Sequence, residues 1–177
     1  MGLFKFQNYS AIKNAQDNPR IEATVETVNG NVFSVVDNLV VGQRTIKEAQ
    51  VPFALAADAQ AEVWVMSNIV DKPEIRNYAN YSVLPGERIR GFNLNKLIGE
   101  VVELSGDLVI ADAVDPIVVG TALVPTVAAD APDLMVWKSI ADPVGYSVYL
   151  EVTAINTFGL FTIDNAGVGY EAKIKTA

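Results

Sequence analysis

Residues 21–38 read IEATVETVNGNVFSVVDN, and this segment carries the clearest structural pattern in the chain. Two runs of alternating apolar and polar residues, Ile21 to Val28 and Val32 to Val36, flank the dipeptide Asn29-Gly30. Alternation with a period of two is typical of a strand with one buried face, and Asn-Gly supplies the two positive-φ positions of a type I′ turn. The segment therefore predicts a β-hairpin that turns at Asn29-Gly30.

The segment 157–177, TFGLFTIDNAGVGYEAKIKTA, predicts a second hairpin with its turn at Asp164 to Gly167. After this turn, apolar and polar residues alternate again. One face of the expected strand carries Val168, Tyr170, Ala172 and Ile174, and the other carries Glu171, Lys173 and Lys175.

The remainder of the chain also favours strands, because it is rich in valine, with 25 copies in all. Further strands are expected within residues 61–70, 99–105, 107–112 and 145–156. Helix is expected only as a turn or two in 53–62 and a single turn in 93–100 that ends at Gly99. The expected fold is mainly β, an antiparallel β-sandwich or small β-barrel with an extended N-terminal arm and long loops.

Residues 1–20 are interpreted as the arm, since they show neither the helical nor the strand period, and residues 21–177 as a β-rich domain. A division of that domain into two small β-subdomains near 80–85 is an alternative. The arm contains Phe4, Phe6 and Tyr9, which are too apolar for a simple disordered tail and indicate that it docks on another surface. The alternative is an N-terminal edge strand that packs on its own domain.

The chain contains no cysteine and no histidine, and this absence limits its chemistry. Cysteine nucleophiles, zinc–thiolate sites, disulfides and the usual histidine base are excluded. Glu100 and Glu103 stand three apart in an expected strand, on opposite faces, so they do not form a catalytic pair. We predict no enzymatic activity, no cofactor and no metal site; the spacing of the loop aspartates 112, 115, 130 and 133 specifies no cation ligand set.

The formal net charge is −8, from 13 basic and 21 acidic residues, which argues against a nucleic-acid partner. Between Leu97 and Trp137 there are seven acidic residues and no lysine or arginine. Half of the residues are hydrophobic and only 19% are charged, so we expect apolar surface to be buried in a homo-oligomer, a dimer or trimer, or in an assembly.

Neither a membrane span nor a signal peptide is expected. The longest apolar stretch, residues 114–130, is interrupted by Pro116 and Pro125 and edged by aspartates, and the first ten residues lack an apolar core. The sequence therefore predicts a protein of the cytosol, or of an assembly built there.

Residues 84–109 read LPGERIRGFNLNKLIGEVVELSGDLV. Pro85-Gly86 suits the centre of a type II turn, and Gly106-Asp107 suits a second turn. Between them, the alternation predicts an edge strand with Arg88 and Arg90 on its outer face. These two arginines are expected to contact acidic groups of a partner or, alternatively, to pair with Glu87 and other local acids.

The run GERIRGFNLNKLIGEVVELSGDLV, residues 86–109, resembles small virion proteins of tailed bacteriophages, many of which are capsid decoration (cement) proteins. The resemblance is closest from Leu97 to Leu108, in the order Leu-x-Gly-Glu-x-Val-x-Leu-Ser followed by a Gly-Asp turn. It implies a non-enzymatic protein of the virion that binds the outer surface of the capsid and stabilises it by bridging major capsid subunits.

The partner-binding residues expected on this basis come from the basic, aromatic arm and from the edge strand. They are Phe4, Lys5, Phe6, Tyr9, Lys13, Arg20, Arg88 and Arg90. Two other functions stay open: another virion part, such as a tail-tube or head-tail connector protein, and a carbohydrate-binding or carboxylate-based hydrolytic β-domain that uses Trp64 or Trp137.

Overall fold

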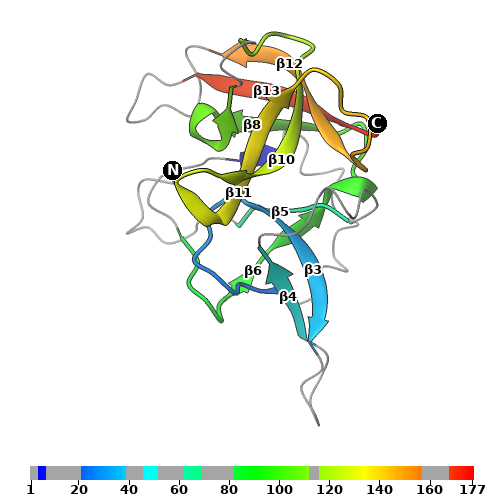
Figure 1. Ribbon diagram of the computed structural model, residues 1–177. Coiled ribbons are helices and arrows are strands. Elements are labelled where there is room, and N and C mark those ends of the chain that lie inside the picture. Colours follow the sequence, from blue (N-terminus) through cyan, green and yellow to red (C-terminus); the bar gives the residue numbers. More distant parts are fainter. Residues whose placement is uncertain are drawn as a thin grey trace.

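Two β-sheets make up the described part of the chain, which in this computed structural model comprises residues 4–6, 21–38, 46–51, 62–68, 82–111, 116–156 and 168–177 (Figure 1). The seven-stranded sheet has the order β1-β8-β13-β12-β10-β11-β9, and the six-stranded sheet has the order β6-β2-β4-β3-β5-β7. Neighbouring strands are antiparallel except β9–β11 and β2–β4, which are parallel. The expected mainly β fold is confirmed, and one of the two mixed sheets nearly closes into a barrel.

The strands of the seven-stranded sheet are β1 (Phe4–Phe6), β8 (Val101–Ser105), β9 (Val109–Ile110), β10 (Ala122–Ala128), β11 (Ala131–Ile140), β12 (Tyr149–Asn156) and β13 (Gly169–Lys175). Those of the six-stranded sheet are β2 (Ile21–Glu22), β3 (Val32–Asn38), β4 (Ile46–Gln50), β5 (Trp64–Met66), β6 (Arg88–Ile89) and β7 (Gly91–Asn93). Two single-turn 3₁₀ helices, η3 (Leu94–Lys96) and η4 (Gly106–Leu108), flank β8. The chain thus passes from one sheet to the other between β7 and β8.

Local turn signals outside residues 21–38 are reproduced closely. Glu87 N donates to Leu84 O across Pro85-Gly86, where Gly86 has φ +84°, as a type II turn requires. The helical turn expected in 93–100 is η3, and Gly99 follows it with φ +95°. The expected strands in 61–70, 99–105, 107–112 and 145–156 contain β5, β8, β9 and β12.

The hairpin expected at Asn29-Gly30 is wrong. Residues 21–28 do not pair with β3: β2 pairs with β4 and β6, Thr27 bridges Val83, and β3 pairs with β4 and β5. The turn itself forms, since Asn31 N donates to Val28 O at 3.1 Å, but of its two central residues only Gly30 has positive φ. It is a type II turn. The backbone twist of a type II turn does not match that of two paired antiparallel strands, so this turn does not form a tight hairpin.

The alternation expected in the closing segment is confirmed as far as it is described, but the expected hairpin partner is not, because β8 and β12 occupy the two edges of β13. β13 pairs antiparallel with β12, and Ala172 and Ile174 are buried while Lys173 is exposed. The expected turn at 164–167, the helical turns in 53–62 and most of the arm lie outside the described residues.

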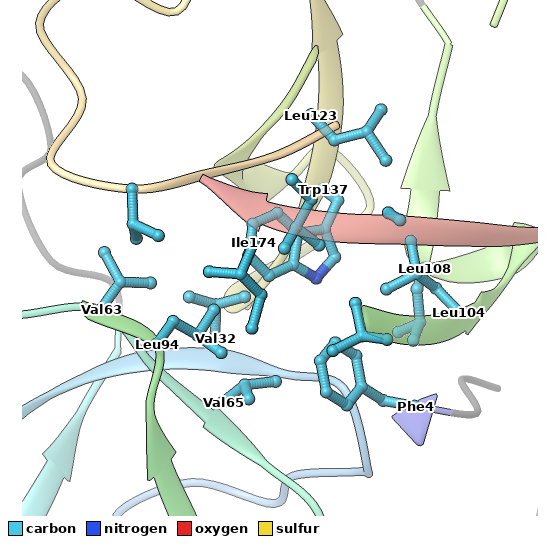
Figure 2. Packing of buried hydrophobic residues seen from close by; sticks show 14 of the residues in the cluster. Phe4, Val32, Val63, Val65, Leu94, Leu104, Leu108, Leu123, Trp137 and Ile174 are labelled. Atoms are coloured by element: carbon cyan, nitrogen blue, oxygen red, sulfur yellow. The ribbon is translucent and has the colours of Figure 1, made fainter. Parts of the chain in front are cut away.

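The largest hydrophobic core lies between the two sheets (Figure 2). Trp137, Leu104 and Ile174 enter it from the seven-stranded sheet, while Val32 and Val65 enter it from the six-stranded sheet. Phe33 of β3 and Trp64 and Met66 of β5 face the opposite side of the sheet. They belong to a smaller second core, which consists of Ile21, Ala23, Phe33, Ala49, Trp64, Met66, Val83 and Ile89. The six-stranded sheet is therefore buried on both faces over β5 and the start of β3.

Candidate interaction surfaces

An open groove of about 950 Å³ lies on the seven-stranded sheet. Its floor comes from β10, β11 and the start of β12, and one wall is the loop 116–121 that leads into β10. The other wall is the loop 141–148 between β11 and β12, which contributes Ala141, Pro143 and Tyr146. Two connections that are distant in sequence therefore meet across one sheet face.

The first wall is a turn that is fixed at both ends. Thr121 N donates to Val118 O at 3.0 Å, and Val118 N donates to the Thr121 hydroxyl at 2.9 Å. Gly120 has φ +93° and donates its N–H to Val152 O of β12, while Val152 N donates to Thr121 O. These bonds hold the turn Val118 to Thr121 against the sheet.

The second wall contains a similar turn. Tyr146 N donates to Pro143 O at 3.1 Å across Val144-Gly145, and Gly145 has φ +97°. The Asp142 carboxylate accepts a hydrogen bond from Val144 N at 3.0 Å. Because both turns are closed by hydrogen bonds, the side chains at their tips are presented in a defined geometry.

The tips of both turns are apolar and exposed. Val144 is 77% exposed, Val119 62% and Val118 54%, which are the highest values for large hydrophobic residues in the part of the chain that the structure describes. Val118 and Val119 line the groove, and Val144 is in the turn of the opposite wall without lining the groove itself. Turn tips are usually polar, and exposed apolar side chains beside a groove are typical of contact surfaces. The three valines and the groove between their turns are called the valine groove below.

The charges at the valine groove are partly neutralised within the chain. Lys175 Nζ lies 2.7 Å from Glu151 Oε2 across the β12–β13 pair, and Glu151 lines the groove. This hydrogen bond, with the charge of the carboxylate, raises the pKa of Lys175. A partner at this site would therefore meet exposed valines, the neutralised Glu151–Lys175 pair and the exposed side chain of Lys138.

Arg88 lies in β6, an edge strand of the other sheet, and Arg90 connects β6 to β7; both are exposed. Arg90 stacks over the Phe92 ring at 5.2 Å from its centroid. Neither guanidinium has an ion-pair partner among the described residues, and the Glu87 carboxylate instead accepts a hydrogen bond from Leu84 N at 2.9 Å. The expected pairing with Glu87 is therefore not observed, and the two arginines form a basic edge.

Two residues of the expected arm are not on the surface. Phe4 and Phe6 form β1, which pairs with β8, and their side chains are 2% and 0% exposed. Both belong to the core between the sheets, as the alternative of an edge strand requires, so neither side chain is available to a partner. The backbone of Lys5 pairs opposite Glu103, and Tyr9, Lys13 and Arg20 lie outside the described residues.

The two indoles do not form a sugar-binding surface. Trp137 is fully buried and Trp64 is 7% exposed, because both point into hydrophobic cores. A sugar ring needs an open aromatic face for stacking, so neither residue provides one.

The residues that the structure describes contain no group of three or more acidic side chains placed to hold a metal ion. The same part of the chain contains no helix that is long and apolar enough to cross a membrane.

Comparison of the chain with protein-family models, with curated proteins and with solved structures gives no match.

Proposed function

We propose that this chain is a non-enzymatic structural protein of a bacteriophage virion, which binds the outer surface of the capsid and bridges major capsid subunits. The proposal rests on the resemblance of residues 86–109 to small virion proteins, together with the valine groove. The groove is the observation that carries it, because Val118 and Val119 are exposed on its wall, and a domain rarely keeps such apolar side chains beside a groove unless a partner covers them.

The rigidity of the groove favours binding to a large, preassembled surface. Each turn is closed by backbone hydrogen bonds, so little conformational entropy is lost when its valine is covered. A capsid offers many identical sites, and weak contacts at several of them add up through avidity.

The basic edge supplies a second contact of a different kind. Arg88 and Arg90 lie on the six-stranded sheet, whereas the valine groove lies on the seven-stranded sheet. A protein that bridges two subunits needs two separate surfaces, and here one carries exposed valines and the other carries two exposed arginines. The acidic stretch between Leu97 and Trp137 repels DNA electrostatically. This suits a protein on the outside of a DNA-filled particle, which must not bind DNA.

Co-sedimentation with purified expanded capsids tests this function. The wild-type protein is expected to sediment with expanded capsids in a saturable stoichiometry. The double change Val119→Ser with Val144→Ser is expected to weaken binding by more than about tenfold, because each exposed apolar contact contributes about 1 kcal/mol or more when buried. Val36→Ser is the control, since Val36 is also exposed but lies on β3 of the other sheet.

Two results would reject the proposal. One is failure of the wild-type protein to bind capsids combined with assembly of the isolated protein into rings or tubes, which would indicate a tail-tube or connector protein. The other is equal loss of binding in the groove variant and in the Val36→Ser control, which would show that the groove has no specific role.

A further inference from the structure

The chain contains one Asn-Gly dipeptide, Asn29-Gly30. Apart from its role in the turn, this dipeptide is the one most prone to deamidation. In a flexible peptide, the nitrogen of a residue that follows asparagine attacks the side-chain carbonyl carbon, Cγ. Glycine reacts most readily because no side chain hinders the approach. The new N–Cγ bond closes a succinimide ring as the C–N bond to the side-chain amide breaks and ammonia leaves. Water then opens the ring to aspartate or isoaspartate.

The folded protein holds both reacting groups in other interactions. Asn29 is only 4% exposed, and its side chain makes two bonds to the backbone of one residue: Nδ2 donates to Asn68 O at 3.0 Å, and Asn68 N donates to Oδ1 at 2.7 Å. The attacking nitrogen is held as well, since Gly30 N donates to Met66 O at 2.8 Å. We call these three bonds the Asn29 clamp.

The packing around the turn explains why this reactive pair is present. A Cβ at Gly30 would overlap the side chain of Leu108 and would stand 3.0 Å from Cβ of Phe4, so glycine alone fits. Gly30 also has φ +93°, which disfavours any other residue. Asparagine at position 29 offers both a donor and an acceptor to the Asn68 backbone, which an aspartate does not.

We propose that Asn29 is a deamidation site that is inert while the Asn29 clamp is closed and reacts with water when the clamp opens. Opening frees Gly30 N from Met66 and lets Asn29 Cγ rotate towards it. The reaction is irreversible, so the Asn29 clamp cannot close again in its original form. Aspartate lacks the donor to Asn68 O and leaves a carboxylate in a buried site, while isoaspartate lengthens the backbone inside the turn from Val28 to Asn31.

A second turn in the same protein provides a matched control. The turn Val118 to Thr121 has the same type of closing bond, and Gly120 has the same φ of +93° as Gly30. Val119 occupies the position that Asn29 occupies in the first turn, but it is 62% exposed, and there is open space around Gly120. Val119→Asn therefore places the same dipeptide in a turn of the same type. There the glycine nitrogen is also held, by Val152 O, but position 119 is exposed and lacks the two side-chain bonds that Asn29 makes to Asn68.

The two sites can be followed separately in that variant. Cleavage after lysine and arginine releases residues 21–44, with Asn29, and residues 97–138, in which the introduced asparagine is the only side-chain amide. The native protein is incubated at mildly alkaline pH, and deamidation is followed by mass spectrometry. Deamidation at position 119 is expected to be more than about tenfold faster than at Asn29. This ratio corresponds to a free energy above about 1.4 kcal/mol for opening the Asn29 clamp. In denaturing urea the two rates are expected to converge.

A variant that weakens the surroundings completes the test. Asn31→Ala removes the acceptor for Val28 N and Thr27 Oγ1 and the donor to Met135 O, without changing Asn29 or Gly30. It is expected to raise the native-state rate at Asn29 and to leave the rate at position 119 unchanged. Equal native rates at the two positions, or slow reaction at Asn29 that persists in urea, would overturn the proposal. If the variant does not fold, comparison of native and urea-treated wild-type protein distinguishes the same outcomes.

Discussion

The ring of Phe6 lies against the ring of Phe92, with centroids 4.8 Å apart, and this contact joins β1 of one sheet to β7 of the other. Phe4 packs edge-on against Phe6 at 5.3 Å. A strand of three residues thus contributes two large side chains to the core between the sheets. Deletion of residues 1–20 would remove both, so it would test stability as well as partner binding.

The first prediction concerns Phe6→Ala. Because Phe6 is fully buried, the change is expected to lower the free energy of unfolding by about 3–5 kcal/mol, measured by urea denaturation. Val144→Ala at an exposed turn tip is the control and should change it by less than about 0.5 kcal/mol. A loss at Phe6 as small as that of the control would contradict the packing of β1 between the sheets.

The second prediction compares two glycines with the same backbone conformation. Gly30 and Gly120 both have φ +93°, so alanine at either position carries a similar backbone cost of about 1–2 kcal/mol. At Gly30 the added Cβ also overlaps Leu108, whereas around Gly120 there is open space. Gly30→Ala is therefore expected to destabilise the protein by about 1–3 kcal/mol more than Gly120→Ala in thermal or urea unfolding. Equal losses would show that Leu108 yields without cost.

The third prediction concerns Asn31, which is 2% exposed and bonds to the turn and to the opposite sheet. Its Oδ1 accepts from Val28 N at 2.7 Å, and its Nδ2 donates to Met135 O of β11 at 3.3 Å. Asn31→Ala leaves these buried groups without this partner and is expected to cost about 1–3 kcal/mol in unfolding free energy. Asn31→Asp keeps the acceptor but buries a charge, so it should cost at least as much near neutral pH. Full stability of Asn31→Asp would contradict the burial of this side chain.

The fourth prediction concerns alkaline pH. The bond to Glu151 raises the pKa of Lys175 above its ordinary 10.5, and burial raises the pKa of Tyr170 above its ordinary 10.0. Both groups hold their protons more tightly in the folded chain, so the unfolded chain loses protons first. The contribution of Lys175 is present below its unfolded pKa and is lost as the pH rises through its folded pKa.

The free energy of unfolding is therefore expected to fall as the pH rises above about 10, measured by urea titration at each pH. Glu151→Gln removes the carboxylate that holds the Lys175 proton and should make this fall smaller. Tyr170→Phe is the matching variant for the second group. An unchanged pH dependence in both variants would show that other groups control the alkaline transition.

The sequence predicted those elements whose signals are local. The Pro85-Gly86 turn, the 3₁₀ turn before Gly99 and the alternation of β13 each depend on neighbouring residues. The hairpin at Asn29-Gly30 failed because strand pairing is not local: β3 finds better partners in β4 and β5, and the Asn29 side chain bonds to Asn68 instead. The mixed topology, with its two parallel pairs, has the same cause.

The candidate site was predicted only in part. The exposure of Arg88 and Arg90 follows from their alternation with the buried Ile89 and Gly91. The valine groove was missed because its walls are separated in the sequence and meet only through the sheet. A signal was present, however: Val118-Val119-Gly120-Thr121 and Pro143-Val144-Gly145-Tyr146 both place valine where turns usually carry a polar residue. Composition alone could not show whether Phe4 and Phe6 pack against a partner or in the core of their own domain, because apolar side chains suit both environments.

The position of β8 has a consequence for how the chain folds. β1 and β13 flank this strand, so that Leu104 lies opposite Phe4 on one side and Tyr170 on the other. During synthesis, β8 leaves the ribosome long before β13 exists, and until then one of its edges has no partner. Completion of the sheet must therefore follow the synthesis of residues 169–175, and folding that depends on such distant pairings is slow. A chaperone that covers β8 in this interval would raise the yield of native protein without changing its final stability.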